Sequence, residues 1–205
     1  IENFSLNSIQ RPSDANVKRC NVINCVDDAV KVDLGRETQE SDEAAMVALQ
    51  QGMDCLDRKE IDVLVGAPQG CASFAPESGC PSLFAKHYDV RNVMPLLVGE
   101  KMKIGFVTNH LAVKNIAESI TFGNVYNKLR LLDSCLQKDF TICKPRIAVL
   151  GLNPHDGENG KYGNEEKNVI IPAMEKARNN GIMALGPYSP EALFSGMEYS
   201  KFDVI

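Results

Sequence analysis

The chain has 205 residues, of which 44% are hydrophobic, so it can bury a substantial core as one large domain or as two small ones. Its 27 acidic and 22 basic side chains give a formal net charge of −5 without a long basic run, which excludes nucleic acid as an expected partner because phosphate neutralisation needs clustered Lys and Arg. No apolar stretch approaches the roughly 20 residues that span a bilayer, and no secretion signal opens the chain, so we expect a cytoplasmic protein with no membrane partner.

The seven cysteines are scattered along the chain, and none forms a CxxC pair. Without a secretion signal, this pattern predicts free thiols, several of them in the core. A zinc site built from cysteines is not expected.

The amino-terminal part of the chain is polar and irregular, with short strand candidates at residues 22–25 and 29–34. Ser41 is followed by two acidic residues and then by an apolar run. This order predicts a helix with Ser41 as its N-cap, continuing to about Leu56.

Several elements follow in the middle of the chain. Residues 61–65 (IDVLV) are predicted to form a buried strand that ends in the loop 66–70, and residues 83–88 a short helix. Residues 93–98 are apolar, but Pro95 favours an edge position, and 104–108 form the next strong strand candidate. Helix, strand and loop in this order indicate a parallel sheet with crossover helices.

Apolar residues recur at helical spacing over 113–140, and Gly123–Asn124 is predicted to divide this stretch into two helices. Further along, 182–185 is a strand candidate, 186–190 a loop rich in Gly and Pro, and 202–205 the beginning of another strand. These patterns place strands and helices in alternation, as in an α/β fold.

The stretch from Arg146 to Glu166 (RIAVLGLNPHDGENGKYGNEE) has the strongest functional signal. Residues 147–150 predict a strand buried on both faces, and the dense Gly, Asn and Pro that follow require a loop at its carboxyl end. Ligands bind at that edge of open α/β sheets. An amphipathic helix follows to about Ala177, and Gly181 is its expected stop.

Two histidines fall where predicted strands give way to loops: His110 and His155. Neutral imidazole is the commonest protein ligand for zinc, and the carboxyl ends of parallel strands meet at one edge of a sheet, so the two could share a metal ion. The alternative is that each is an ordinary loop histidine, because two histidines without a third ligand do not define a metal site. His87 falls in a predicted helix and is expected at the surface or in packing.

The glycines around His155 fit neither the dinucleotide fingerprint nor the P-loop, so a surface turn is the simpler interpretation. Glu165 and Glu166 are expected to stabilise a helix amino terminus, and we do not assign them as an acid–base pair.

The motifs GLNPHDGE, GNEE, IIPA and GPYSPEA, in this order, resemble the 4-hydroxythreonine-4-phosphate dehydrogenase (PdxA) family of pyridoxal phosphate biosynthesis, which has a GLNPHAGE loop, GxEE, IIPA and GPxxAD. The run IGFVTNHLAVKNIAESIT is similar to the family's VTxHxPL segment, and VDLGRETQESDEAAMVALQQ to its approach to the first signature loop. The resemblance covers nearly the whole chain.

The resemblance implies an incomplete three-layer α/β/α subunit of the isocitrate and isopropylmalate dehydrogenase type, in a homodimer with shared active sites. Residues 1–85 would form part of a first α/β domain, and residues 86–205 part of a second that carries the metal histidines and dimer contacts. The family oxidises a phosphorylated hydroxy amino acid, 4-phosphohydroxy-L-threonine, with NAD or NADP, and the product decarboxylates. A divalent metal ion (Zn, Mg or Co) held by three histidines serves this chemistry, and His110 and His155 match the first two ligands.

The chain departs from the family pattern in several places. The third metal histidine belongs to a YHDQ motif that would follow Ile205, and the family's opening GDxxGIGxE segment is absent. Where the family has GPxxK and GHTE to hold the substrate, this chain has APQGC (67–71) and GCPS (79–82), and a thiol and a proline do not replace those contacts. Glu191 stands near the usual Asp of GPxxAD.

Two hypotheses follow from this combination. The first is a dehydrogenase of the family, with substrate preference shifted by the altered loop. The second is a non-catalytic relative or fragment that acts as a metal-binding or dimerisation module.

Overall fold

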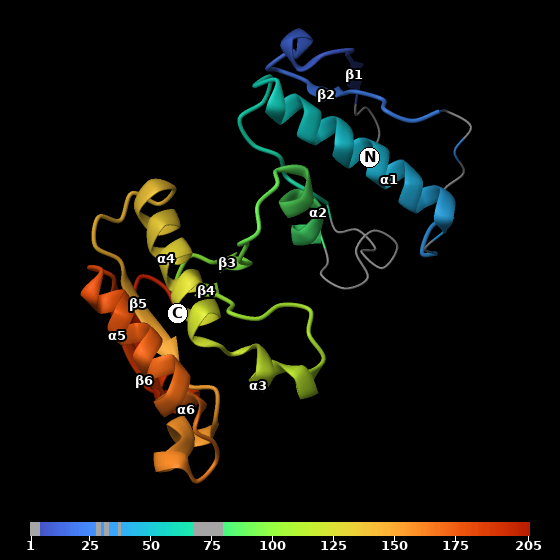
Figure 1. Cartoon of the computed structure of the whole chain (residues 1–205). Helices are drawn as coiled ribbons and strands as arrows, with labels where there is room; N and C mark the ends of the chain where they lie inside the picture. Colours follow the sequence, from blue (N-terminus) through green and yellow to red (C-terminus); the bar gives the residue numbers. More distant parts are fainter. Residues whose placement is uncertain (1–4, 28–29, 31–32, 37, 68–79) are drawn as a thin grey trace. The chain divides into compact units, whose positions relative to one another are not determined.

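The computed structural model describes residues 5–27, 30, 33–36, 38–67 and 80–205, without the side chains of residues 80–82. The chain forms two compact units, Ile1–Pro76 and Glu77–Ile205 (Figure 1). The assignment of two partial domains to residues 1–85 and 86–205 stays a prediction.

The first unit contains a pair of three-residue strands, β1 (Leu6–Ser8) and β2 (Cys20–Val22), which run parallel with Leu6 opposite Cys20. The sequence analysis missed β1 and expected the second strand at residues 22–25, where only Val22 is part of β2. The strand expected at 29–34 lies partly outside the described residues, and its described residues form no strand.

The long helix of the first unit is α1 (Gln39–Asp57), and its N-cap is Thr38 rather than Ser41. The Thr38 side chain accepts a hydrogen bond from the Ser41 amide at 3.2 Å, and the Ser41 hydroxyl accepts one from the Thr38 amide at 3.1 Å. The predicted start was therefore wrong by three residues, because Ser41 is the N3 residue of a reciprocal capping box whose N-cap is Thr38.

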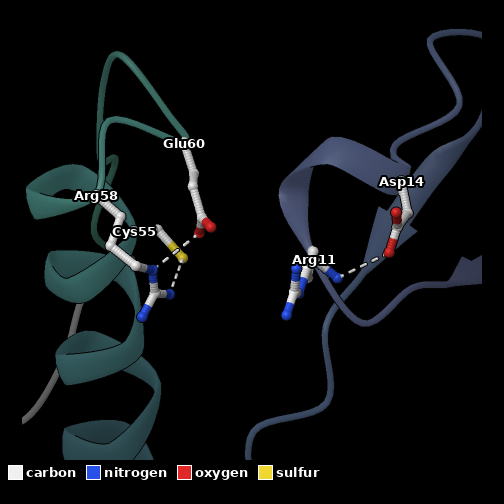
Figure 2. Close-up of polar contacts among 5 residues, drawn as sticks. All are labelled: Arg11, Asp14, Cys55, Arg58 and Glu60. Carbon is white, nitrogen blue, oxygen red and sulfur yellow. Dashed lines mark hydrogen bonds and ion pairs between the residues drawn. The ribbon is translucent and has the colours of Figure 1, made fainter.

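Figure 2 shows two sets of polar contacts in the first unit. The Arg58 guanidinium, just after α1, donates to the Glu60 carboxylate at 3.2 Å and to the Cys55 sulfur at 3.6 Å. The Arg11 amide donates to the Asp14 carboxylate at 3.2 Å across a short 3-10 turn. Such exposed ion pairs contribute little to stability, so this unit depends on local capping and on the buried face of α1.

The prediction of a buried strand at residues 61–65 was wrong. The segment is irregular, and Val63 and Val65 are 72% and 86% exposed. A strand needs a hydrogen-bonded neighbour, and none of the described residues pairs with this segment.

The described residues of the second unit form four strands in two hydrogen-bonded pairs. The strands β3 (Leu96–Val98) and β4 (Lys103–Gly105) are antiparallel, and β5 (Arg146–Leu150) and β6 (Met183–Tyr188) are parallel. Helix α5 (Ile171–Asn179) connects the parallel pair, which confirms the predicted β–α–β arrangement there.

The last residues of the chain lie between β4 and β5. The Ile205 amide donates to the Lys103 carbonyl at 2.9 Å, and the Gly105 amide to the Ile205 carbonyl at 2.8 Å, which is the pattern of a parallel pair. On the other side, Val204 forms a parallel bridge with Ile147. Instead of the full strand that the sequence predicted at residues 202–205, the structure has a parallel bridge at Val204 and the hydrogen bonds of Ile205, which together link the two strand pairs.

Helices of the second unit begin with α2 (Cys80–His87), close to its prediction. Residues 113–140 form a 3-10 turn, α3 (Ile116–Ser119) and α4 (Phe122–Lys138), so the helix break lies at 120–121 rather than at the predicted Gly123–Asn124. The reason is the Thr121 side chain, which caps α4 by accepting from the Asn124 amide at 3.2 Å.

The main core lies between α4, α5 and the sheet, with α4 and α5 packed on each other. Its fully or nearly buried side chains come from every one of these elements: Val125, Leu129, Leu132, Leu136, Ile147, Ala173, Met174, Ala177, Ala184 and Val204. A second cluster joins Ala148, Leu193 and Ile205. Leu193 belongs to α6 (Pro190–Ser195), a helix that the sequence analysis missed, and Gly186 and Pro187 lie in β6 rather than in the predicted loop.

These elements establish a mixed α/β fold, whereas the three-layer arrangement stays a prediction. All five described cysteines are free thiols, as predicted, and Cys55 is buried. Among the described residues, no helix has the length and apolarity that a bilayer crossing requires.

Leu136 provides a test of the core, because its side chain is 0% exposed. Leu136→Ala is expected to lower the free energy of unfolding by about 2–5 kcal/mol, since the lost methyl groups leave a cavity. Urea denaturation measures the change. Val113→Ala, at an 84% exposed position, is the control and should alter stability by less than about 0.5 kcal/mol. Equal effects of both variants would contradict the assigned core.

Candidate functional site at the carboxyl edge of the sheet

The GLNPHDGE loop leaves the carboxyl end of β5 and returns into a π-helical turn, Glu166–Ile170, that continues as α5. His155 lies in this loop, as predicted, and its side chain is exposed. π-Helical turns are rare and occur frequently at functional sites.

The loop backbone turns in the left-handed sense over five consecutive residues. Residues 155–159 have φ angles of 51°, 54°, 78°, 42° and 59°. Only one of the five, Gly157, adopts this conformation without steric cost, and each of the others loses about 1–2 kcal/mol relative to right-handed backbone. Such a turn persists only where surrounding contacts hold it.

The carboxylate of Glu166 supplies those contacts. It is 3% exposed, and its Oε1 accepts hydrogen bonds from the backbone amides of Leu152 and Asn153, both at 2.7 Å. Its Oε2 accepts from the Asn153 side-chain amide at 3.0 Å, which also donates to Glu165 at 2.7 Å. Burial alone would raise the pKa of the Glu166 carboxyl, but the hydrogen bonds from Asn153 and Leu152 outweigh burial and lower that pKa.

Two glycines let the loop approach this carboxylate. A Cβ at Gly157 would lie 2.8 Å from Glu166 Oε2, and a Cβ at Gly163 would lie 2.3 Å from the Asn153 side-chain nitrogen. Both distances are shorter than van der Waals contact allows. The glycines that the sequence analysis assigned to a surface turn are therefore required for close packing against Glu166.

Asp156 occupies the interior side of the same loop. Its Oδ1 is buried without a hydrogen-bond partner among the described residues, and it packs against Gly151, where a Cβ would lie only 2.4 Å away. Burial raises the pKa of the Asp156 carboxyl, and the negative charges of Glu166 and Glu191 raise it further.

His155 lies on the solvent side of the loop. Its ring centroid is 6.3 Å from that of Tyr162, with the planes tilted by 55°. Glu191, the residue at the Asp position of GPxxAD, accepts a hydrogen bond from the Ser189 hydroxyl at 2.5 Å, and this bond lowers the pKa of Glu191, with a smaller contribution from the charge of His155. His155 and Glu191 are thus close enough to interact electrostatically.

His110 follows β4, and its side chain is also exposed. Like His155, it has left-handed backbone, with a φ of 50°. Because Val204 and Ile205 run parallel to both β4 and β5, the two histidines follow strands that point to the same edge of the sheet. Two strands with one strand between them lie about 10 Å apart.

The donor set for a metal ion is partly present. Both imidazoles are exposed, and no described side chain or backbone group forms a hydrogen bond with either ring. Among the described residues, however, no group of three His, Cys, Asp or Glu side chains is arranged to hold an ion. The assignment of His110 and His155 to one metal ion therefore stays a prediction.

The fold is an α/β fold with a glycine-rich loop at the carboxyl end of β5, the sheet edge where ligands bind in open α/β proteins. The sequence profile described as "Pyridoxal phosphate biosynthetic protein PdxA" matches residues 1–205. The chain belongs to the PdxA family.

Similar proteins agree with this membership. A 4-hydroxythreonine-4-phosphate dehydrogenase of Bacteroides thetaiotaomicron is 35% identical over 99% of this chain and 57% of its own length, and one of Sulfurihydrogenibium is 32% identical over 93% and 63%. The crystal structure of the Klebsiella pneumoniae 4-hydroxythreonine-4-phosphate dehydrogenase superposes with a TM-score of 0.83 at 23% identity, over 97% of this chain and 63% of that one, which shows a shared fold. The chain thus spans about three fifths of the length of these relatives.

The sequence analysis located the loop but not the residue that holds it. Glu166 was expected to stabilise a helix amino terminus, and it does stand in the first helical turn, but its carboxylate binds the loop before the helix. The pairing of GLNPH with a downstream GNEE was the available signal. The altered substrate motifs at 67–71 and 79–82 lie almost entirely outside the described residues and stay predictions.

Glu166→Gln tests the loop support. The variant keeps the side-chain shape but loses the negative charge, and its amide nitrogen would face the Asn153 donor. We expect a loss of about 1.5–3 kcal/mol in unfolding free energy at pH 7, measured by urea denaturation. Because the folded-state pKa of Glu166 is depressed, this contribution is present above the unfolded value of about 4.3 and disappears as pH falls through the folded pKa. A difference that stays constant down to pH 2 would rule out this role.

Asp156→Asn tests whether the ionised Asp156 carboxylate destabilises the same loop. The folded-state pKa of Asp156 is raised, so its ionised form destabilises the protein at neutral pH and ceases to do so below about pH 3.9. The variant should gain up to about 1 kcal/mol at pH 7, seen as a higher melting temperature, and gain nothing at pH 3. A less stable variant at pH 7 would show that the carboxylate is compensated.

Proposed function

We propose that this protein catalyses the NAD(P)-dependent oxidation and decarboxylation of 4-phosphohydroxy-L-threonine to 3-amino-2-oxopropyl phosphate in pyridoxal phosphate biosynthesis. The main support is the GLNPH loop, which carries His155 at the carboxyl edge of the sheet and is held there by Glu166. Family membership over the whole chain adds to it.

His110 and His155 are the proposed protein ligands of a divalent metal ion, with the remaining ligand supplied from outside the described residues. When bound, the ion would supply Lewis-acid stabilisation of negative charge on the substrate oxygen. The chain's own contribution is positional. Glu166 fixes the loop backbone, and the left-handed turn presents the His155 ring to solvent at the sheet edge.

Activity tests the proposal directly. Purified protein with a divalent metal ion and NAD or NADP should reduce the cofactor when 4-phosphohydroxy-L-threonine is added, measured by the absorbance of the reduced nicotinamide. His155→Ala should lower kcat/KM at least about a hundredfold, because the variant loses one of the proposed metal ligands. His87→Ala removes a histidine that packs on Tyr88 and should leave kcat/KM within about twofold. No turnover by metal-loaded protein would reject the enzyme proposal.

A second candidate, a non-catalytic metal-binding or dimerisation module, is supported by the two-histidine donor set and the altered substrate motifs. Metal binding separates the two candidates when combined with the activity assay. Uptake of zinc that depends on His110 and His155, without turnover, would favour the module. Uptake that His155→Ala leaves unchanged would remove His155 as a ligand in either case.

A further inference from the structure

A cleft of about 380 Å³, with both polar and apolar lining, lies next to the His110 loop in the second unit. This volume is within the roughly 300–1,000 Å³ of small-molecule sites. Half of its lining residues are apolar, including Phe106 and Val107. Its polar lining residues are two cations, two hydroxyl residues and two amides: Arg91, Lys128, Thr108, Ser119, Asn109 and Asn124.

Lys128 is the best-fixed of these groups. Its Nζ donates to the Asn92 side-chain oxygen at 3.1 Å and to the Val93 carbonyl, so two of its three N–H donors are used and the third is free. Its stem lines a separate apolar cavity of about 210 Å³. Burial lowers the pKa of the Lys128 ammonium, as expected for a charge held without an opposite charge.

The charge of the cleft is one-sided. Arg91 immediately precedes Asn92, so the contact between Asn92 and Lys128 keeps the two basic residues near each other. Among the described lining residues there is no Asp or Glu, and Lys128 and Arg91 form no ion pair with any described carboxylate. The chain has a net charge of −5, so the positive charge of this cleft is opposite in sign to the charge of the protein as a whole.

We propose that this cleft binds a phosphate group, with Lys128 and Arg91 as its cationic ligands and the Thr108 hydroxyl and the Asn109 amide as neutral donors. A phosphate oxyanion matches the free donor of Lys128 and the planar donor fork of Arg91. Either free inorganic phosphate or the phosphate of an organic monoester has this chemistry. The assignment concerns binding alone and does not depend on whether the protein is an active dehydrogenase.

Calorimetric titration of the purified protein with inorganic phosphate and, separately, with O-phospho-L-threonine tests the proposal. Arg91 is exposed and makes no hydrogen bond with a described residue, so Arg91→Gln should leave the fold intact while weakening phosphate binding about tenfold or more. Lys128→Met should weaken it at least as much. Tighter binding of phosphothreonine would identify an organic monoester as the ligand, and equal binding would identify free phosphate.

Arg130→Gln is the matched control, because it removes the same charge from an exposed position on α4 outside the cleft. Its phosphate affinity should stay within about twofold of the parent. Two results would overturn the proposal: no saturable binding of either probe by the parent protein, or equal weakening by Arg91→Gln and Arg130→Gln, which would reflect general charge alone. Circular dichroism of each variant confirms that the comparison is between folded proteins.

Discussion

The second unit depends on one buried carboxylate that holds a loop in an unfavourable conformation. Glu166 accepts the amide protons of the two residues that leave β5, and from that point the backbone turns left-handed through His155. The energetic cost of the turn and the hydrogen bonds that offset it are both several kcal/mol, so neither the loop nor the carboxylate would have its present form without the other. The position of His155 at the sheet edge results from this balance.

The folded protein shifts the pKa values of Glu166 and Asp156 in opposite directions. Glu166 is stabilised as an anion because three N–H groups point at it, whereas Asp156, ten residues earlier, has a buried oxygen with no donor among the described residues. Negative charge near a cation site attracts the cation, and the cluster of Asp156, Glu166 and Glu191 would therefore be relieved by an ion held at His155. Without a cation, the repulsion among these carboxylates therefore opposes the hydrogen bonds that hold the loop.

The sequence predicted best where one local pattern dominated. The buried run of β5, the loop after it, and the β–α–β order through α5 followed from apolar runs and glycine density. Predictions failed where a distant partner decides the outcome: 61–65 is apolar but has no described strand beside it, and the break before α4 depends on the Thr121 cap rather than on Gly123. The role of Glu166 was also hidden, because its partners are thirteen and fourteen residues away.

The segment from Asp203 to Ile205 sets the order in which the sheet can assemble. It is bonded to β4 about a hundred residues earlier and to β5 through Arg146, whose amide donates to the Asp203 carboxylate at 2.8 Å. During synthesis, β4 and β5 leave the ribosome long before the strand that belongs between them. The two histidine loops therefore take their final spacing only once this segment is in place, and without it the flanking strands would present unpaired edges to which neighbouring chains can bind.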